Sequence, residues 1–200
     1  MRELKNSIRQ ILRQRKEAMT PEDRLEKSKR VCYHLMTLIQ DGETVMVYTS
    51  KEKEVNTKPL ITTLFEHGNP VIVPIIVKDD ISLRLSYLRD FSVLMPSTFG
   101  VPEPVGNEIF ATGENVDTII LPMLGFDRTG GRMGYGAGYY DRFLAKNQNV
   151  RKIGIAFACQ EYDNLPVDEN DIPMDYSITE DGIVYSKGRE NCGDQRYKDS

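Results

Sequence analysis

Residues 116–144 read VDTIILPMLGFDRTGGRMGYGAGYYDRFL, and this stretch decides the fold class. It opens at residues 116–121 with an apolar, β-branched run that has the length of a strand buried on both faces. A loop rich in glycine follows, and the chain from about Gly138 to Lys146 then has the pattern of a helix. Buried strands that alternate with helices are typical of α/β proteins with a largely parallel sheet.

The same two patterns recur on either side of this stretch. Helices are predicted at residues 3–17, 21–40 and 56–67. Strands are predicted at residues 44–49, 70–77, 81–88, 152–158 and 182–185. Thr20 and Pro21 have the residue types expected at the start of the second helix. Residues 95–107 hold three prolines and two glycines, which indicates a loop over the surface.

No internal repeat and no linker divides these elements. The sequence therefore predicts a single three-layer α/β/α domain with a mostly parallel sheet over residues 1–187, followed by a polar C-terminal tail at 188–200. Ligands of such sheets bind beyond the carboxyl ends of the strands. We therefore expect the ligand site just after Thr49, Leu121 and Ala158.

The charge of the chain argues against a nucleic-acid-binding protein. The 200 residues carry a formal net charge of −4, which gives no support to binding of a polyanion. Lysine and arginine gather in residues 1–30, whereas residues 161–175 are acidic. A local basic patch on an acidic protein suits a small anionic ligand better than a polymer.

Cysteine usage and the N-terminus narrow the classes further. Cys32, Cys159 and Cys192 are scattered and form no CxxC motif, which argues against a disulfide framework and a structural zinc site. The N-terminus lacks the apolar segment of a secretory signal, and the longest apolar run, residues 71–77, is too short to span a bilayer. We expect a cytoplasmic protein without membrane contact.

The glycine-rich loop carries the strongest chemical signal. Six glycines fall between Gly125 and Gly138, directly after a buried strand and before a helix. Backbone amides in such a loop, together with a helix N-terminus, suit a phosphate group, and Arg132 adds a side chain that can bind phosphate with two parallel hydrogen bonds. Neither the Walker A motif nor the dinucleotide fingerprint is present. A flexible surface loop is the simpler alternative, but the paired tyrosines at its end favour a phosphate site.

A longer match extends this reading. Gly125 through Asp141 fit the run G-F-D-x-x-G-x-R-[LM]-G-x-G-x-G-Y-Y-D without a gap. The chain thereby resembles the 5-formyltetrahydrofolate cyclo-ligase family, also called methenyltetrahydrofolate synthetases, from its basic first helix to the acidic segment near Asp171. The resemblance implies a ligase that uses ATP and Mg²⁺ to convert 5-formyltetrahydrofolate, a reduced folate, into 5,10-methenyltetrahydrofolate, releasing ADP and phosphate.

The resemblance also implies an ATP site. Lys5 and Arg9 share one face of the first helix and match the K-x-x-x-R pair that contacts ATP in the family, although a solvated basic face is the simpler reading of such a pair. Arg13 continues this stripe and is interpreted as a solvated charge. The implied ATP-binding residues are Lys5, Arg9, Arg132, Gly134, Tyr135, Gly136, Ala137, Gly138, Tyr139 and Tyr140. Arg132 and Tyr140 are the predicted catalytic residues, with Arg132 stabilising the transferring phosphoryl group.

A folate site is implied by a second motif. Glu54-Val55-Asn56-Thr57 resembles the E-[IV]-x-T element of the family, whose carboxylate accepts paired hydrogen bonds from the pterin ring. Thr49 and Tyr139 are expected to line the same pocket. Without the resemblance, Glu54 would read as part of an exposed charged turn.

Magnesium is implied at two acids. Asp141 and Asp171 match the acids that the family associates with Mg²⁺, which favours a few carboxylates together with phosphates and water. Spacing alone does not decide between Asp168, Asp171 and Asp175.

Two departures from the family keep alternatives open. Tyr135 and Ala137 stand where some members carry arginine and lysine, so the charge on phosphate must be met by Arg132, Lys5, Arg9, magnesium and backbone amides. Two other functions stay open. The first is a sugar-phosphate isomerase or CoA-transferase-like enzyme, which would not release ADP on turnover. The second is a non-catalytic folate- or nucleotide-binding module, which would bind its ligands without turnover. A monomer is expected.

Overall fold

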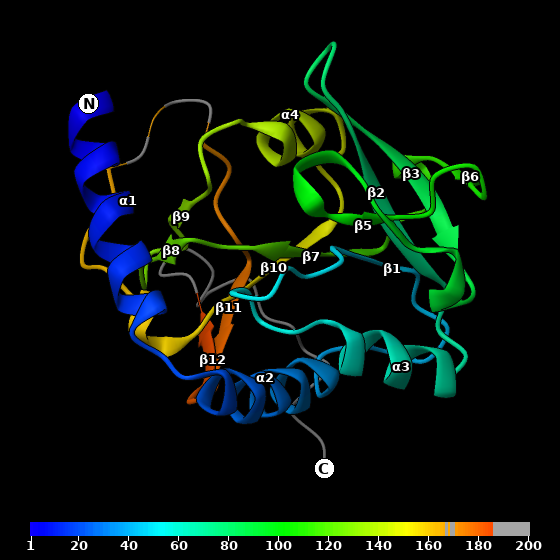
Figure 1. Ribbon diagram of the computed structural model, residues 1–200, viewed down its shortest axis with the longest axis horizontal. Helices are drawn as coiled ribbons and strands as arrows, with labels where there is room; N and C mark the ends of the chain where they lie inside the picture. The colour runs from blue at the N-terminus through cyan, green and yellow to red at the C-terminus, as the bar shows by residue number, and fades with distance from the viewer. Residues whose placement is uncertain (167, 169–170, 186–200) are drawn as a thin grey trace.

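A computed structural model describes residues 1–166, 168 and 171–185, and Figure 1 shows its architecture. An eight-stranded sheet forms the centre, in the order β12-β11-β10-β7-β1-β2-β3-β6. Its strands are β1 (Val45–Val47), β2 (Val71–Val77), β3 (Ser82–Leu88), β6 (Ile109–Ala111), β7 (Thr118–Pro122), β10 (Arg151–Ile155), β11 (Tyr176–Thr179) and β12 (Gly182–Tyr185).

The central strands β11, β10, β7, β1 and β2 are parallel, which confirms the predicted mostly parallel sheet. Antiparallel strands complete it at both edges, β12 on one side and β3 with β6 on the other. β3 follows β2 through a tight turn at residues 78–81. A connection this short permits only antiparallel pairing, because a parallel return needs a long crossover.

Helices cover both faces of the sheet, as predicted. α2 (Pro21–Met36) and α3 (Lys58–Glu66) lie along one face and α4 (Tyr139–Lys146) lies on the other (Figure 1). Val45 and Val47 of β1 belong to the core on the α2 side, whereas Met46 belongs to the core on the α4 side. Successive residues of a strand point to opposite faces, so a strand covered twice must be apolar throughout. The three-layer arrangement therefore follows from the continuous apolar strands.

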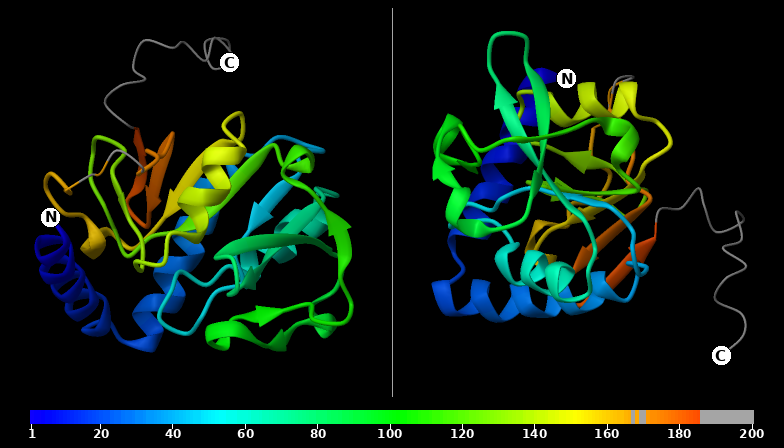
Figure 2. Two further views of the ribbon diagram at one scale, coloured as in Figure 1. Left: turned by 90° about the horizontal axis from the view of Figure 1, so that it is seen from above. Right: turned by 90° about the vertical axis from the view of Figure 1, so that its right-hand side faces the viewer.

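The first helix, α1 (Arg2–Glu17), lies outside both helical layers (Figures 1 and 2). Strands β8 (Gly125–Phe126) and β9 (Arg132–Met133) form a small hairpin. The apolar side chains Ile8 and Leu12 of α1 pack on Leu124, which precedes β8, and on Met133 of β9. α1 is thus attached to the glycine-rich segment, and its Lys5 and Arg9 contact residues at the carboxyl ends of the strands.

Some predicted boundaries were wrong. α2 begins as expected, with Thr20 and Asp23 forming a reciprocal capping box, but it ends at Met36 rather than near Gln40. The following residues turn, and the side chain of Asn69 donates hydrogen bonds to the carbonyl oxygens of Gln40 and Glu43. The predicted loop 95–107 contains a short hairpin of β4 (Met95–Pro96) and β5 (Pro102–Glu103).

Among the described residues, no helix is long and apolar enough to cross a membrane. The predicted tail at 188–200, with Cys192, lies outside the part of the chain that the structure describes. Cys32 is buried and Cys159 is partly buried, and both are free thiols. Cys32 lies on the buried face of α2 and packs in the core, in agreement with a structural role.

Candidate active site

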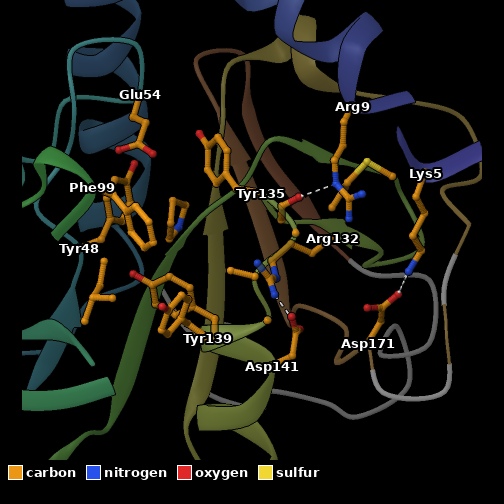
Figure 3. Close-up of a pocket in the computed structure, with 18 of the residues that line it drawn as sticks. Lys5, Arg9, Tyr48, Glu54, Phe99, Arg132, Tyr135, Tyr139, Asp141 and Asp171 are labelled. Carbon is orange, nitrogen blue, oxygen red and sulfur yellow. Dashed lines mark hydrogen bonds and ion pairs between the residues drawn. The ribbon is translucent and has the colours of Figure 1, made fainter. Parts of the chain in front are cut away.

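A cavity of about 1030 Å³ opens at the carboxyl ends of β1, β2 and β7 (Figure 3). It is lined by α1, by the segments that follow these strands, by the β4–β5 hairpin and by the glycine-rich run. Every site residue predicted from the sequence lies in its wall. These residues are Lys5, Arg9, Thr49, Glu54, Arg132, Gly134, Tyr135, Gly136, Ala137, Gly138, Tyr139, Tyr140, Asp141 and Asp171. The volume lies at the upper end for ligand sites, which suits large ligands.

The cavity has two chemically different ends. Glu54, Tyr48, Phe99 and Tyr139 lie at one end in Figure 3, and the rings of Phe99 and Tyr139 meet edge to face with centroids 6.5 Å apart. Ionic side chains lie at the other end, where Lys5, Arg9, Arg132, Asp141 and Asp171 converge. The first end can hold a flat heterocycle and the second can hold phosphates.

The glycine run forms the wall of the ionic end. Gly138 has φ +76° immediately before α4. Gly136 has φ +109°, and a Cβ atom at this residue would lie 3.6 Å from the guanidinium carbon of Arg9. Both conformations are rare for residues with a Cβ atom. Within the described residues, the amides from Gly134 to Asp141 donate no hydrogen bond. Free amides at a helix N-terminus are suited to an anion, so this wall fits the predicted phosphate site.

Arg132 is the buried cation of this wall. Its side chain is only 4% exposed, and Nη2 lies 2.6 Å from a carboxylate oxygen of Asp141. Its Nε has no partner among the described residues. A buried donor without an acceptor costs about 1–3 kcal/mol. A phosphate oxygen in the cavity would supply that acceptor.

Lys5 joins α1 to the acidic segment. Its ammonium lies 2.6 Å from Asp168 and 2.5 Å from Asp171. Burial lowers the pKa of Lys5, but hydrogen bonds to these two carboxylates raise it above its ordinary value. Asp175 is excluded from the cavity, because it is buried at the amino ends of the strands, where its carboxylate accepts a hydrogen bond from the Lys152 amide.

Glu54 faces three tyrosines at the other end. Its carboxylate accepts a hydrogen bond from the amide of Lys51 at 2.9 Å. Burial, and then the charge of Glu54, raise the pKa values of Tyr48, Tyr135 and Tyr140. Arg132 opposes this shift for Tyr140 without reversing it. All three hydroxyls are therefore neutral at physiological pH and can donate hydrogen bonds.

The β4–β5 hairpin closes the aromatic end. The hydroxyl of Thr49 donates to the carbonyl oxygen of Pro102 at 2.6 Å, and the buried carboxylate of Glu103 accepts from the amide of Ile76 at 2.8 Å. These bonds hold Phe99 and Val101 against the cavity. Thr49 thus lines the cavity, but its hydroxyl proton is already donated to the hairpin.

Not every polar residue of the glycine-rich segment serves the cavity. Asp127 is buried, and its carboxylate accepts hydrogen bonds from the amides of Thr129, Gly131 and Leu165. It fixes the turn between β8 and β9 and thereby places Arg132.

Several lining residues were missed in the sequence. Tyr48 and Phe99 carried no signal beyond lying near a predicted strand end or loop. Arg13, interpreted as a solvated charge, is exposed but also lines the cavity, since it continues the face of α1 that bears Lys5 and Arg9. Lys16, further along α1, is buried and reaches Tyr135.

The acids fit a magnesium ion that binds together with phosphate groups. Within the part of the chain that the structure describes, no three acidic, histidine or cysteine side chains converge on a common point. Asp141 and Asp171 are instead paired with Arg132 and Lys5. Mg²⁺ needs only one or two carboxylates when phosphates and water complete its shell.

The family model and the curated relatives identify one family. The model of the 5-formyltetrahydrofolate cyclo-ligase family matches residues 1–180. The 5-formyltetrahydrofolate cyclo-ligase of Escherichia coli K12 is 32% identical over 176 residues, which cover 84% of this chain and 96% of that protein. The 5-formyltetrahydrofolate cyclo-ligase of Mus musculus is 31% identical over 193 residues, which cover 88% of this chain and 94% of that protein.

Solved structures give the same result. The NMR structure of Aquifex aeolicus 5,10-methenyltetrahydrofolate synthetase has a TM-score of 0.79 and 31% identity, over 92% of this chain and 93% of that one. The 5,10-methenyltetrahydrofolate synthetase of Mycoplasma pneumoniae has a TM-score of 0.71 and 21% identity, over 88% of this chain and 98% of that one. At this identity the similarity supports the fold alone.

The chain belongs to the 5-formyltetrahydrofolate cyclo-ligase family. The resemblance seen in the sequence is thereby confirmed, and with it the ligase class. Family membership thus favours the ligase over the alternative of a sugar-phosphate isomerase or CoA-transferase-like enzyme.

Proposed function

We propose that this protein converts 5-formyltetrahydrofolate and ATP into 5,10-methenyltetrahydrofolate, ADP and phosphate, with Mg²⁺ bound alongside the nucleotide. Family membership supports the reaction. One structural observation supports the placement of its chemistry: a buried arginine whose Nε has no partner among the described residues lies in the wall of a cavity that has an aromatic end and an ionic end.

The reaction must activate an unreactive amide. The formyl carbon bonded to nitrogen is a poor electrophile, and its oxygen is a poor leaving group. Transfer of the γ-phosphoryl group to this oxygen forms an oxygen–phosphorus bond and releases ADP. The neighbouring folate nitrogen then attacks the carbon, loses its proton, and phosphate departs with the former formyl oxygen. The protein must mainly position the two ligands and stabilise charge.

The ionic end is proposed to hold the nucleotide. Lys5, Arg9 and Arg132 supply positive charge, and the free amides of the glycine run supply neutral donors. The planar guanidinium of Arg132 is the group best placed to follow the transferring phosphoryl group, because it is buried and its Nε lacks an acceptor. Tyr140 is proposed to act beside it as a neutral hydrogen-bond donor.

The aromatic end is proposed to hold the folate. The Glu54 carboxylate can accept paired hydrogen bonds from a pterin ring, and Tyr139 and Phe99 offer ring faces and edges for stacking. Thr49 lines this end through its methyl group, since its hydroxyl is bonded to the hairpin.

Asp141 and Asp171 are proposed to hold magnesium. When bound there, the ion would screen the phosphate charge. Each carboxylate would then give up its present partner, which frees the Arg132 guanidinium and the Lys5 ammonium for phosphate oxygens. Asp168 shares Lys5 with Asp171 but is more exposed. The predicted monomeric state and cytoplasmic location stay predictions from the sequence.

An oxygen label tests this reaction directly. 5-Formyltetrahydrofolate carrying ¹⁸O in its formyl group is converted with unlabelled ATP, and the released phosphate is analysed by mass spectrometry. One ¹⁸O atom per phosphate is expected. Label lost to water during turnover would overturn phosphorylation of the formyl oxygen. Binding of both ligands without any conversion would instead identify a non-catalytic module.

A further inference from the structure

A buried lysine lies behind the wall of the cavity at its folate end. Lys16 is near the C-terminal end of α1, is 5% exposed, and donates a hydrogen bond of 3.0 Å to the hydroxyl of Tyr135. Its ammonium lies 5.1 Å from the centroid of the Tyr135 ring. No carboxylate among the described residues forms an ion pair with Lys16.

Tyr135 connects this lysine to the proposed pterin ligand. Its side chain lines the cavity and its hydroxyl is directed to the side of Glu54 (Figure 3). Burial lowers the pKa of Lys16 and raises that of Tyr135, and the negative charge of Glu54 favours the ammonium form of the first and the neutral hydroxyl of the second. Lys51 lies 5.7 Å from the centroid of the same ring. Lys16, Tyr135 and Glu54 therefore form one polar cluster.

The cluster is unfavourable as a purely structural feature. An ammonium removed from water and bonded to a neutral phenol, with no ion pair, lowers rather than raises the stability of the fold. Burial accordingly lowers the pKa of Lys16. An apolar side chain of similar length would fill the same space without this penalty. The charge is thus better explained by its contact with Tyr135, whose side chain lines the cavity.

We propose that Lys16 is a positioning residue for the folate, which holds the Tyr135 hydroxyl at the end of the cavity that bears Glu54, where this hydroxyl can contact the bound folate. This inference rests on the proposed function of the aromatic end. It assigns Tyr135 to the folate end through its side chain, although its backbone belongs to the glycine run that faces the phosphates.

α1 then serves both ends of the cavity. Lys5 and Lys16 are eleven residues apart, about 16 Å along a helix. Arg9 lies between them and donates a hydrogen bond of 3.2 Å to the carbonyl oxygen of Gly134, the residue before Tyr135. Because Arg9 retains this contact, loss of the Lys16 charge should disturb the Tyr135 side chain and leave the backbone of the glycine run in place.

A double-mutant cycle tests the proposal. Lys16→Met keeps the apolar stem, Tyr135→Phe keeps the ring, and Lys29→Met makes the same change at an exposed site on α2 as a control. Affinities for 5-formyltetrahydrofolate and for MgATP are measured separately by calorimetry, and folding is checked by thermal melting. Each single variant should bind 5-formyltetrahydrofolate about tenfold more weakly and MgATP within twofold of wild type, since a hydrogen bond to a charged group is lost.

The double variant should bind the folate no more weakly than the weaker single variant, because both changes remove the same interaction. Unchanged folate affinity in Tyr135→Phe, additive losses, or equal weakening toward both ligands would overturn the proposal. Tyr135→Phe keeps the test decisive if Lys16→Met does not fold, because the Tyr135 side chain is 39% exposed. Wild-type protein is titrated first. Failure of wild type to bind 5-formyltetrahydrofolate would refute the proposed function itself, whereas normal wild-type binding with unaffected variants would refute only the role of Lys16.

Discussion

Arg132 and Asp141 form an ion pair, with 2.6 Å between Nη2 and a carboxylate oxygen, at the two ends of the glycine run. The pair neutralises a buried cation at the ionic end of the cavity. Each member of the pair can exchange its protein partner for a ligand. The Arg132 guanidinium would then bind phosphate, and the Asp141 carboxylate would bind magnesium. The predictions below test the two halves of this exchange.

Arg132→Ala should lower kcat about 10²- to 10³-fold, because a donor that stabilises developing charge acts mainly in the transition state. The KM values should change less. Arg132→Lys keeps the positive charge but lacks the planar guanidinium, so its kcat should lie between those of wild type and Arg132→Ala. Steady-state kinetics check this, with thermal melting as a control because Asp141 loses its partner. A folded Arg132→Ala variant with near-normal turnover would remove Arg132 from the proposed role.

Asp141→Asn and Asp171→Asn should each raise the magnesium concentration that half-maximal ATP binding requires, because each removes a carboxylate proposed to hold the ion. Calorimetric titration of ATP at stepped magnesium concentrations measures this. Asp175→Asn is the matched control, since Asp175 lies at the opposite edge of the sheet. It should leave the magnesium dependence unchanged and lower the melting temperature. Identical magnesium dependence in wild type and Asp141→Asn would contradict the assignment.

Substitutions at the two ends should affect different substrates. Arg9→Met should raise the KM for ATP, and Glu54→Gln should raise the KM for 5-formyltetrahydrofolate, each by about 10- to 100-fold, because a hydrogen bond to a charged group contributes about 1.5–3 kcal/mol. The other KM should stay near its wild-type value in each case. Initial-rate kinetics with one substrate saturating decide this. Equal effects of either variant on both substrates would refute the division of the cavity.

The folate affinity should fall in alkaline solution below the ordinary titration range of lysine. Burial lowers the pKa of Lys16 from 10.5, although Glu54 and Glu17 oppose this while Lys51 and Arg13 add to it. Lys16 is therefore charged at neutral pH and loses its proton earlier than an exposed lysine as the pH rises. The raised pKa values of Tyr135 and Tyr140 keep both hydroxyls neutral over this range.

The measurement is the dissociation constant of 5-formyltetrahydrofolate between pH 7 and 10, for wild type and for Lys16→Met. Wild type should lose affinity toward the alkaline end, and the variant should show weaker, pH-independent binding. Parallel pH profiles of the two proteins would show that Lys16 does not cause the change.

The sequence predicted the fold well where side-chain patterns act locally. Apolar runs such as residues 71–77 must be buried on both faces, and the Thr20 cap fixes a helix start. β6 and β11 were missed because they are only three and four residues long and pair with strands far from them in the sequence. The β8–β9 hairpin was missed because each of its strands has only two residues. The end of α2 was misplaced because Asn69, far along the chain, holds the turn that follows it.

The site residues were predictable where one contiguous motif carries them, as in the glycine run. Parallel strands bring their carboxyl ends together, so Thr49, Glu54 and Arg132 share a cavity. Phe99 and Lys16 could not be found in this way. Phe99 reaches the cavity because Thr49 and Glu103 hold the β4–β5 hairpin. Lys16 reaches Tyr135, behind the cavity wall, because α1 packs on β9.

Turnover of both substrates together tests the central claim most directly. Purified protein is mixed with 5-formyltetrahydrofolate, ATP and magnesium, and the methenyl chromophore and ADP are followed in the same sample. The account predicts equal amounts of both products, and neither product when ATP or magnesium is left out. A folded protein that forms no chromophore, or that forms it without releasing ADP, would contradict it.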